Sequence, residues 1–291
     1  MILANGTTVA AVLHLAPEAR SRFSPAVDDT GPGPRVSVLG SFGFSAADGS
    51  RPVLSGGSQR LLAFLALRNQ PVHRTTAAGW LWPEASDDHA SSSLRSALTR
   101  LGARTRDAIA VNDIDLRLAD DVVVDIRDSQ GLAHRLLEQE TSPNVRELGA
   151  PAISALSRDL LPDWYDDWVV PEAEEWRQLR LHALEAMSVR LTAVGRFAHA
   201  MCAALAAVRV EPLRESATAA VIRVHLAEGN QADAQREFRR YRALLQRELG
   251  VEPTAQLFEL VGVAPTANRR AATSVARPKW AEARAPLPSR S

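Results

Sequence analysis

The segment from residue 87 to residue 104 carries the polar side chains whose spacing best supports chemistry. On a helical wheel, one side is small and polar with an arginine: Ser92, Arg95, Ser96 and Thr99. The other side is apolar: Leu94, Ala97, Leu98 and Leu101. A helix with this pattern buries one face and leaves donors and acceptors on the other. Such side chains suit hydrogen bonds to base edges in a DNA major groove; the alternative is an ordinary solvated helix face.

Arginines flank this segment at positions that suit contacts with phosphate. Arg100 and Arg104 lie on one flank of the expected helix, whereas Arg60 and Arg74 stand near the starts of two earlier helices. A guanidinium group presents paired N–H donors to an anionic oxygen pair. Surface ion pairs with Glu84 or Asp87 are the alternative. The expected DNA-binding set is Ser92, Ser93, Arg95, Ser96, Thr99, Arg100, Arg104, Arg60 and Arg74.

The elements that must position these residues follow from the hydrophobic pattern. Short β-like runs at 35–40 and 42–44 precede expected helices at about 58–68, 75–82 and 87–104. The alternating run from Ile109 to Ile126 predicts a β-hairpin. Two strands, three helices and a terminal hairpin are the element order of a winged helix. Trp80 and Trp82, in an apolar segment before Pro83, are expected in its core.

Residues 130–263 are almost entirely of helical pattern. Gly195 and Gly229 are 34 residues apart, and so are Ala200 and Ala234, which is the tetratricopeptide period. The glycine ends one helix, and the small alanine lets paired helices approach. Further helices at about 132–139 and 172–193, with a cap at 253–260, are expected to complete the stack.

Three aromatic residues and one cysteine in this half have expected packing roles. Trp164, Tyr165 and Trp168 are expected to pack between helices, with contact to a partner as the alternative. Cys202 lies among alanines and is expected to be a buried small apolar residue.

Composition removes several classes of protein. Lys279 is the only lysine, so a phosphate-binding GxxxxGK[ST] loop cannot occur, and HExxH and CxxC motifs are missing. A single cysteine excludes an internal disulfide and any site with several thiolates. Apolar runs are too short to span a bilayer, and the first residues lack a basic region typical of secretion. We therefore expect a cytoplasmic protein that is not an enzyme, with no cofactor, no metal and no membrane contact.

Several segments resemble the Streptomyces antibiotic regulatory protein (SARP) and AfsR-like transcriptional regulators. Residues 57–67 (GSQRLLAFLAL), 81–83 (LWP) and 93–101 (SLRSALTRL) resemble the three helices of the family's winged helix. Residues 160–169 (LLPDWYDDWV), 176–185 (WRQLRLHALE), 211–215 (EPLRE), 241–245 (YRALL) and 248–254 (ELGVEPT) resemble its bacterial transcriptional activator domain.

The resemblance implies an α+β winged helix-turn-helix domain followed by an all-α, tetratricopeptide-like helical repeat domain. The expected divisions are a disordered arm (1–34), the winged helix (35–124), the activator domain (125–264) and a disordered tail (265–291). The resemblance also implies a transcriptional activator that reads direct repeats in double-stranded DNA, as a possible homo-oligomer, and recruits RNA polymerase.

The expected wing departs from the family pattern, because it is acidic. It reads NDIDLRLADD over residues 112–121, where the family usually has Gly-Tyr and basic residues. Residues 35–128 contain eleven arginines and eleven acidic residues, so this domain is neutral. An acidic wing is repelled by phosphate. The alternative function is therefore a partner-binding adaptor whose winged helix no longer reads DNA.

Overall fold

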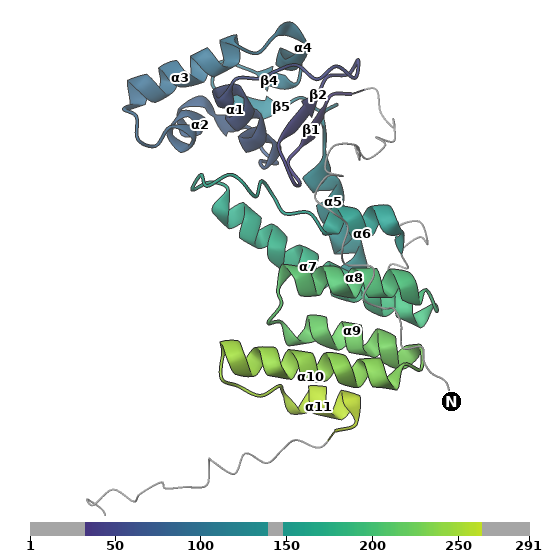
Figure 1. Ribbon diagram of the computed structural model, residues 1–291. Helices are drawn as coiled ribbons and strands as arrows, with labels where there is room; N and C mark the ends of the chain where they lie inside the picture. The colour runs from purple at the N-terminus through teal and green to yellow at the C-terminus, as the bar shows by residue number, and fades with distance from the viewer. Residues whose placement is uncertain (1–32, 139–147, 264–291) are drawn as a thin grey trace, which may run out of the picture.

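The computed structural model describes residues 33–138 and 148–263 (Figure 1). The expected arm (1–34) and tail (265–291) therefore lie outside the described residues, except for Gly33 and Pro34. Pro34 is buried, and its carbonyl accepts a 2.9 Å hydrogen bond from the N–H of Val123. A small domain of mixed helix and sheet precedes a helical one, so the coarse fold expectation is confirmed.

The first domain contains a three-stranded sheet built from segments distant in the sequence. Its strands are β1 (Arg35–Ser37), β2 (Gly43–Ser45) and β6 (Val123–Val124). β1 lies in the middle, antiparallel to β2 and parallel to β6. Val36 on β1 and its partner Val124 on β6 are both buried, so this sheet closes one side of the core.

Three helices and a second sheet complete the domain. The helices are α1 (Gly56–Ala66), α2 (Arg74–Leu81) and α3 (Asp87–Thr99), followed by the short α4 (Ala103–Arg106). The second sheet contains β3 (Val72–His73), β4 (Ile109–Val111) and β5 (Asp115–Leu118) in the order β3-β5-β4. We call residues 109–118 the wing. This order and pairing are consistent with a winged helix.

Two elements of the first domain end earlier in the structure than the sequence predicted. The helix expected to reach Arg104 ends at Thr99, because the chain turns at Gly102 before α4 begins. The hairpin expected to reach Ile126 ends at Leu118. A turn at 119–121 then takes Val123 and Val124 to the other sheet, and Ile126 lies in a helix.

The second domain is a stack of helices that continues away from the first (Figure 1). Its elements are α5 (Asp125–Leu137), α6 (Ala150–Leu156), α7 (Val170–Ala193), α8 (Phe197–Val210), α9 (Glu215–Ala227), α10 (Gln231–Glu248) and α11 (Ala255–Val261). The first of them starts at Asp125, directly after β6 and earlier than the periodicity at 132–139 indicated. In the described part of the chain, no helix is both long enough and apolar enough to cross a membrane.

The 34-residue offset is visible in the backbone. Gly195 and Gly229 both have positive φ, 72° and 81°, which glycine adopts at little cost. The following residues, Arg196 and Asn230, donate hydrogen bonds of 2.9 Å and 2.8 Å to Leu191 and His225 carbonyls at the ends of the preceding helices. Ala200 and Ala234 are both fully buried. The two helix junctions are thus built alike.

The two domains share backbone hydrogen bonds. Residues 159–169 connect α6 to α7, and we call them the interface segment. Leu39 and Leu160 form an antiparallel bridge, flanked by the bonds Gly40 N–H to Asp159 O (2.7 Å) and Leu161 N–H to Val38 O (3.0 Å). The helical domain therefore adds a short strand-like segment to the continuation of β1.

The aromatic residues and the cysteine divide between buried and exposed positions. Trp168 is buried, as expected, but it packs between the two domains. Tyr165 is 87% exposed, so its expected packing between helices is wrong, and Trp80 is 50% exposed, so its expected place in the core is wrong. Cys202 is exposed as well, because the buried face of α8 is formed by its alanines.

Candidate nucleic-acid interface

Helix α3 presents a polar face to solvent. Ser86 precedes it, and Asp87 and Asp88 occupy its first turn, where the helix dipole favours negative charge. Its buried side consists of Ala90, Leu94, Ala97 and Leu98. Its exposed side includes Ser92, Arg95, Ser96, Thr99 and Arg100, whereas Ser93 is half-buried. The amphipathic pattern expected from the sequence is therefore present.

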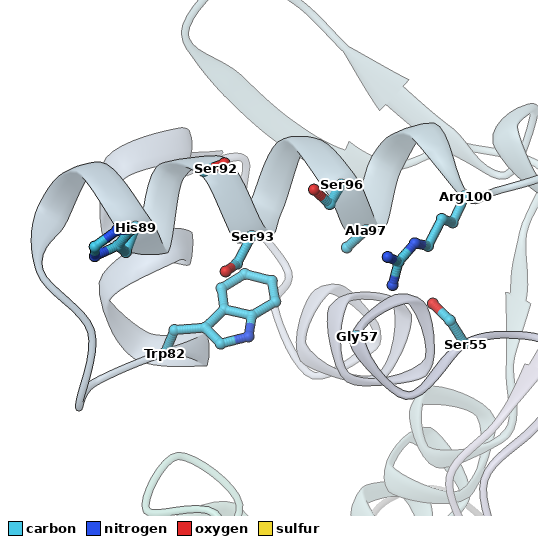
Figure 2. A pocket seen from close by; sticks show the side chains of 9 residues that line it. All are labelled: Ser55, Gly57, Trp82, His89, Ser92, Ser93, Ser96, Ala97 and Arg100. Carbon is cyan, nitrogen blue, oxygen red and sulfur yellow. The ribbon is translucent and has the colours of Figure 1, made fainter.

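A groove of about 380 Å³ runs between α3 and the start of α1 (Figure 2). It brings together Ser92, Ser93, Ser96 and Arg100 of the expected set. The Arg100 guanidinium and the Ser55 hydroxyl point toward each other across it (Figure 2). The remaining lining residues are Ser55, Gly57, Trp82, His89 and Ala97.

A second groove, also of about 380 Å³, lies between α3, the start of α2 and the wing. Arg95 and Arg74 both line it, so the structure brings these two expected residues together. The backbone N–H of Arg74 donates a 2.8 Å hydrogen bond to the carbonyl of Ile114, which fixes α2 to the wing. Asp113 lines the same groove, so a carboxylate shares it with the two arginines.

The other two expected arginines take part in ion pairs. Arg104 lies on α4, where it pairs with Asp48 at 2.6 Å and donates to the Ser50 hydroxyl at 3.3 Å. Both partners of this pair are largely exposed, so it contributes little to stability. Arg60 points to the second domain and pairs with Asp166 of the interface segment. It is not gathered with the α3 residues.

The wing is short and acidic. The Asn112 side chain accepts a 2.6 Å hydrogen bond from the N–H of Asp115, which closes the turn. Arg117 pairs with Asp120, and the hydrogen bond between them lowers the pKa of the Asp120 carboxyl. Asp113 and Asp121 are exposed. Within the wing, Asp113 and Asp115 outnumber Arg117, and Asp120 and Asp121 follow directly after it, so the formal net charge here is negative at neutral pH.

Several groove residues were not expected from the sequence. His89 comes one turn before Ser93 on α3, and its ring lies 3.1 Å from the Ser86 hydroxyl. His73 and Thr75, whose side chains are 2.7 Å apart, line the second groove at the start of α2. Residues 89 and 92 are three apart, so helical periodicity could have placed His89 on the same face as Ser92. In the described ranges, no three His, Cys, Asp or Glu side chains gather as metal ligands would.

The comparisons with known proteins bear on both domains. Residues 125–262 match the family model of the bacterial transcriptional activator domain. The fold resembles that of Mycobacterium tuberculosis EmbR, solved in complex with a low-affinity phosphopeptide, with a TM-score of 0.60 and 22% identity. That likeness covers 79% of this chain and 64% of the EmbR chain. No curated protein matches the sequence significantly.

The family match covers the five segments that resemble the activator domain in the sequence. It begins at Asp125, the first residue of α5, and ends at Gly262, just after α11. The activator domain expected from the sequence is therefore confirmed: residues 125–262 belong to the bacterial transcriptional activator domain family, and the fold of the chain is similar to that of EmbR, as the resemblance to SARP/AfsR-like regulators predicts.

Proposed function

We propose that this chain is a sequence-specific DNA-binding transcriptional activator. Its first domain acts as a winged helix that inserts α3, the recognition helix, into the major groove of double-stranded DNA. Its second domain, a tetratricopeptide-like repeat, recruits RNA polymerase at promoters with direct repeats, where a homo-oligomer forms on the DNA. The protein acts in the cytoplasm, and no catalytic role is part of this proposal.

The observation that carries the proposal is the exposed face of α3 between two grooves. Arg95, Ser96 and Thr99 are exposed on this face, while Leu94 and Leu98 anchor the opposite side in the core. Arginine reads guanine through paired hydrogen bonds, and serine or threonine bonds with several bases. A helix of this kind fits a groove about 12 Å wide.

The grooves give the sugar–phosphate backbones a place on either side of α3. Arg100 lines one groove and Arg74 the other. Each neutralised phosphate releases condensed counterions, so log affinity falls with log salt by about 0.9 per contact. Contacts of this type hold the protein in register and carry no sequence information themselves.

The experiment that tests DNA binding uses the full chain and a random duplex library. We expect selection to yield a preferred duplex, and fluorescence anisotropy to show affinity that falls steeply between about 50 mM and 200 mM salt. Undetectable binding to every duplex at the lower salt would refute DNA binding. Polymerase recruitment is tested separately, by in vitro transcription from a promoter that carries the selected site.

A second candidate function, a partner-binding adaptor without DNA binding, is favoured by the charge of the wing. Asp113 lines the groove of Arg95 and presents like charge to any phosphate there. On the DNA-binding proposal, replacing Asp113 and Asp115 with Asn tightens DNA binding several-fold at low salt. The gain shrinks at physiological salt, where the Debye length is about 8 Å. Asp128→Asn, an exposed change on α5, is the control. An adaptor gains no DNA affinity from the double change.

A further inference from the structure

We infer that Asp166 and Trp168 of the interface segment are positioning residues for DNA reading. They belong to the activator domain, contact α1, and through α1 hold the recognition helix α3 in place. The inference rests on the proposed function, and it makes the two domains together, rather than the first alone, the unit that reads sequence.

The aromatic contact gives α1 a fixed position against the interface segment. Trp168 and Phe64 are each 1% exposed, and their rings meet edge to face with centroids 5.3 Å apart. Trp164 continues the contact, 6.1 Å from Trp168 and 5.8 Å from Phe42 of the first domain. Such edge-to-face pairs have a preferred geometry in addition to the area they bury.

Ion pairs on α1 and just beyond its C-terminal end join it to the second domain. Arg60, in the first half, pairs with Asp166, and each side chain is less than a third exposed. Arg68, just beyond the last turn, pairs with Glu172 at the start of α7. Arg127 of α5 donates a 2.8 Å hydrogen bond to the carbonyl of Arg68. Partial burial makes these pairs stronger than fully exposed ones.

Helix α1 in turn contacts α3 directly. The Ser58 hydroxyl is fully buried and donates a 2.9 Å hydrogen bond to the carbonyl of Ala97. Gly57 lies so close to α3 that a Cβ added there would stand 3.6 Å from the Ala97 side chain. Ala97 is one residue from Ser96 on the exposed face, so a shift of α1 moves the residues that read bases.

The backbone of the interface segment is itself held in a fixed position. Its backbone is bonded to residues 38–40, and Leu161 adopts a positive φ of 40°, which a branched side chain takes only under constraint. After Leu161 its side chains alternate, with Trp164, Asp166 and Trp168 inward and Tyr165 and Asp167 exposed.

The test compares conservative variants in the full chain. Asp166→Asn removes the charge that pairs with Arg60. Trp168→Phe reduces the area of contact with the Phe64 ring. It also removes a buried indole N–H that has no acceptor among the described residues, which limits the cost of the change in stability. The matched control is Asp167→Asn, the neighbouring carboxylate, which is exposed and has no ion pair with another described residue.

The measured quantities are the affinities for the selected duplex and for a shuffled duplex of equal length. We expect Asp166→Asn and Trp168→Phe to weaken binding to the selected duplex by roughly five- to tenfold. Affinity for the shuffled duplex should stay within about twofold, because it depends on phosphate contacts, which carry no sequence information. The control should match wild type. Circular dichroism establishes that each variant is folded at the assay temperature.

The other outcomes overturn the inference. If a variant bound less DNA because it was partly unfolded, its affinities for the selected and the shuffled duplex would fall together. The positioning role instead predicts a loss for the selected duplex alone. Tighter binding of Asp166→Asn to both duplexes would mean that the released Arg60 contacts phosphate instead. If wild type discriminates between duplexes and the variants do so equally well, only the positioning role fails. If wild type itself binds both duplexes alike, the proposed function fails and takes the positioning role with it.

Discussion

The carboxylate of Asp125 accepts hydrogen bonds from the backbone N–H groups of Val38, at 2.9 Å, and of Leu39, at 3.2 Å. Asp125 is the first residue of α5, and Val38 follows β1, so this contact closes the first domain where the helical domain begins. Both backbone donors lie in a buried part of the chain and have their acceptor in this one side chain.

Replacing Asp125 with Ala should lower the free energy of unfolding by about 1–3 kcal/mol. The change leaves buried donors without an acceptor, and each unsatisfied donor carries a desolvation cost. Urea denaturation at pH 7 measures the loss. Asp128→Ala, an exposed acid in the same first turn of α5, should cost only a few tenths of a kcal/mol. Equal losses for the two variants would contradict this role of Asp125.

The stability contributed by Asp125 should depend on pH. Burial raises the pKa of the Asp125 carboxyl, against the opposing effect of its backbone hydrogen bonds and of Arg158. The folded protein then binds this proton more tightly than the unfolded chain. The part of its stabilisation that comes from holding the proton is present below the unfolded value of about 4 and is lost as pH rises through the raised value, whereas the carboxylate still accepts the hydrogen bonds from Val38 and Leu39. Asp125→Asn cannot titrate, so wild type should lose stability relative to it as pH rises above about 4. Urea midpoints measured at a series of pH values from 4 upward follow the trend, and a gain in the relative stability of wild type would contradict a raised pKa.

Arg95 and Arg104 should separate in their effects on DNA binding. Arg95 lines the groove beside the wing and is free to reach base edges, so Arg95→Ala should cost about 1–3 kcal/mol on the selected duplex and relax sequence preference. Arg104 sits beyond the end of α3 in an exposed pair with Asp48, so Arg104→Ala should weaken all duplexes alike and reduce the salt slope by about one. Anisotropy titrations on selected and shuffled duplexes give both values. Equal, sequence-independent losses would remove the base-reading role from Arg95.

Enlarging Ala234 should overpack the helical domain. This residue is fully buried at the position equivalent to Ala200, so Ala234→Leu should lower stability by about 1–3 kcal/mol. Ala243→Leu places the same side chain on the exposed side of α10 and should be nearly neutral. Thermal denaturation of the two variants makes the comparison. A stable Ala234→Leu protein would show that the 34-residue offset does not mark a close helix contact.

Local pattern predicted the elements whose signals lie within one segment. The two faces of α3 and the junctions at Gly195 and Gly229 follow from helical periodicity and from the positive φ that glycine adopts. The hydrophobic pattern also located the first two helices to within about two residues of their observed bounds.

Local sequence pattern could not predict pairings between segments that are distant in the sequence. Val122–Val124 has the composition of a hairpin strand, and only the parallel partner at Arg35 and Val36 decides its sheet. The pairing of Arg60 with Asp166 joins residues on different domains, so no helical wheel could show that Arg60 turns from α3. An apolar segment before Pro83 predicted Trp80 in the core, although the buried side of α2 is formed by Ala77, Ala78 and Leu81.

The bridge between Leu39 and Leu160 has a consequence for how such regulators can be recombined. A chimaera joined at residue 125 looks natural, because the family match begins there and β6 has just ended. That junction would nevertheless pair residues 36–68 of one parent with residues 159–172 of another, across backbone bonds, rings and ion pairs that have to fit each other. Functional exchanges should therefore transfer these two stretches together, and sequence changes on one side of the junction should be accompanied by changes on the other.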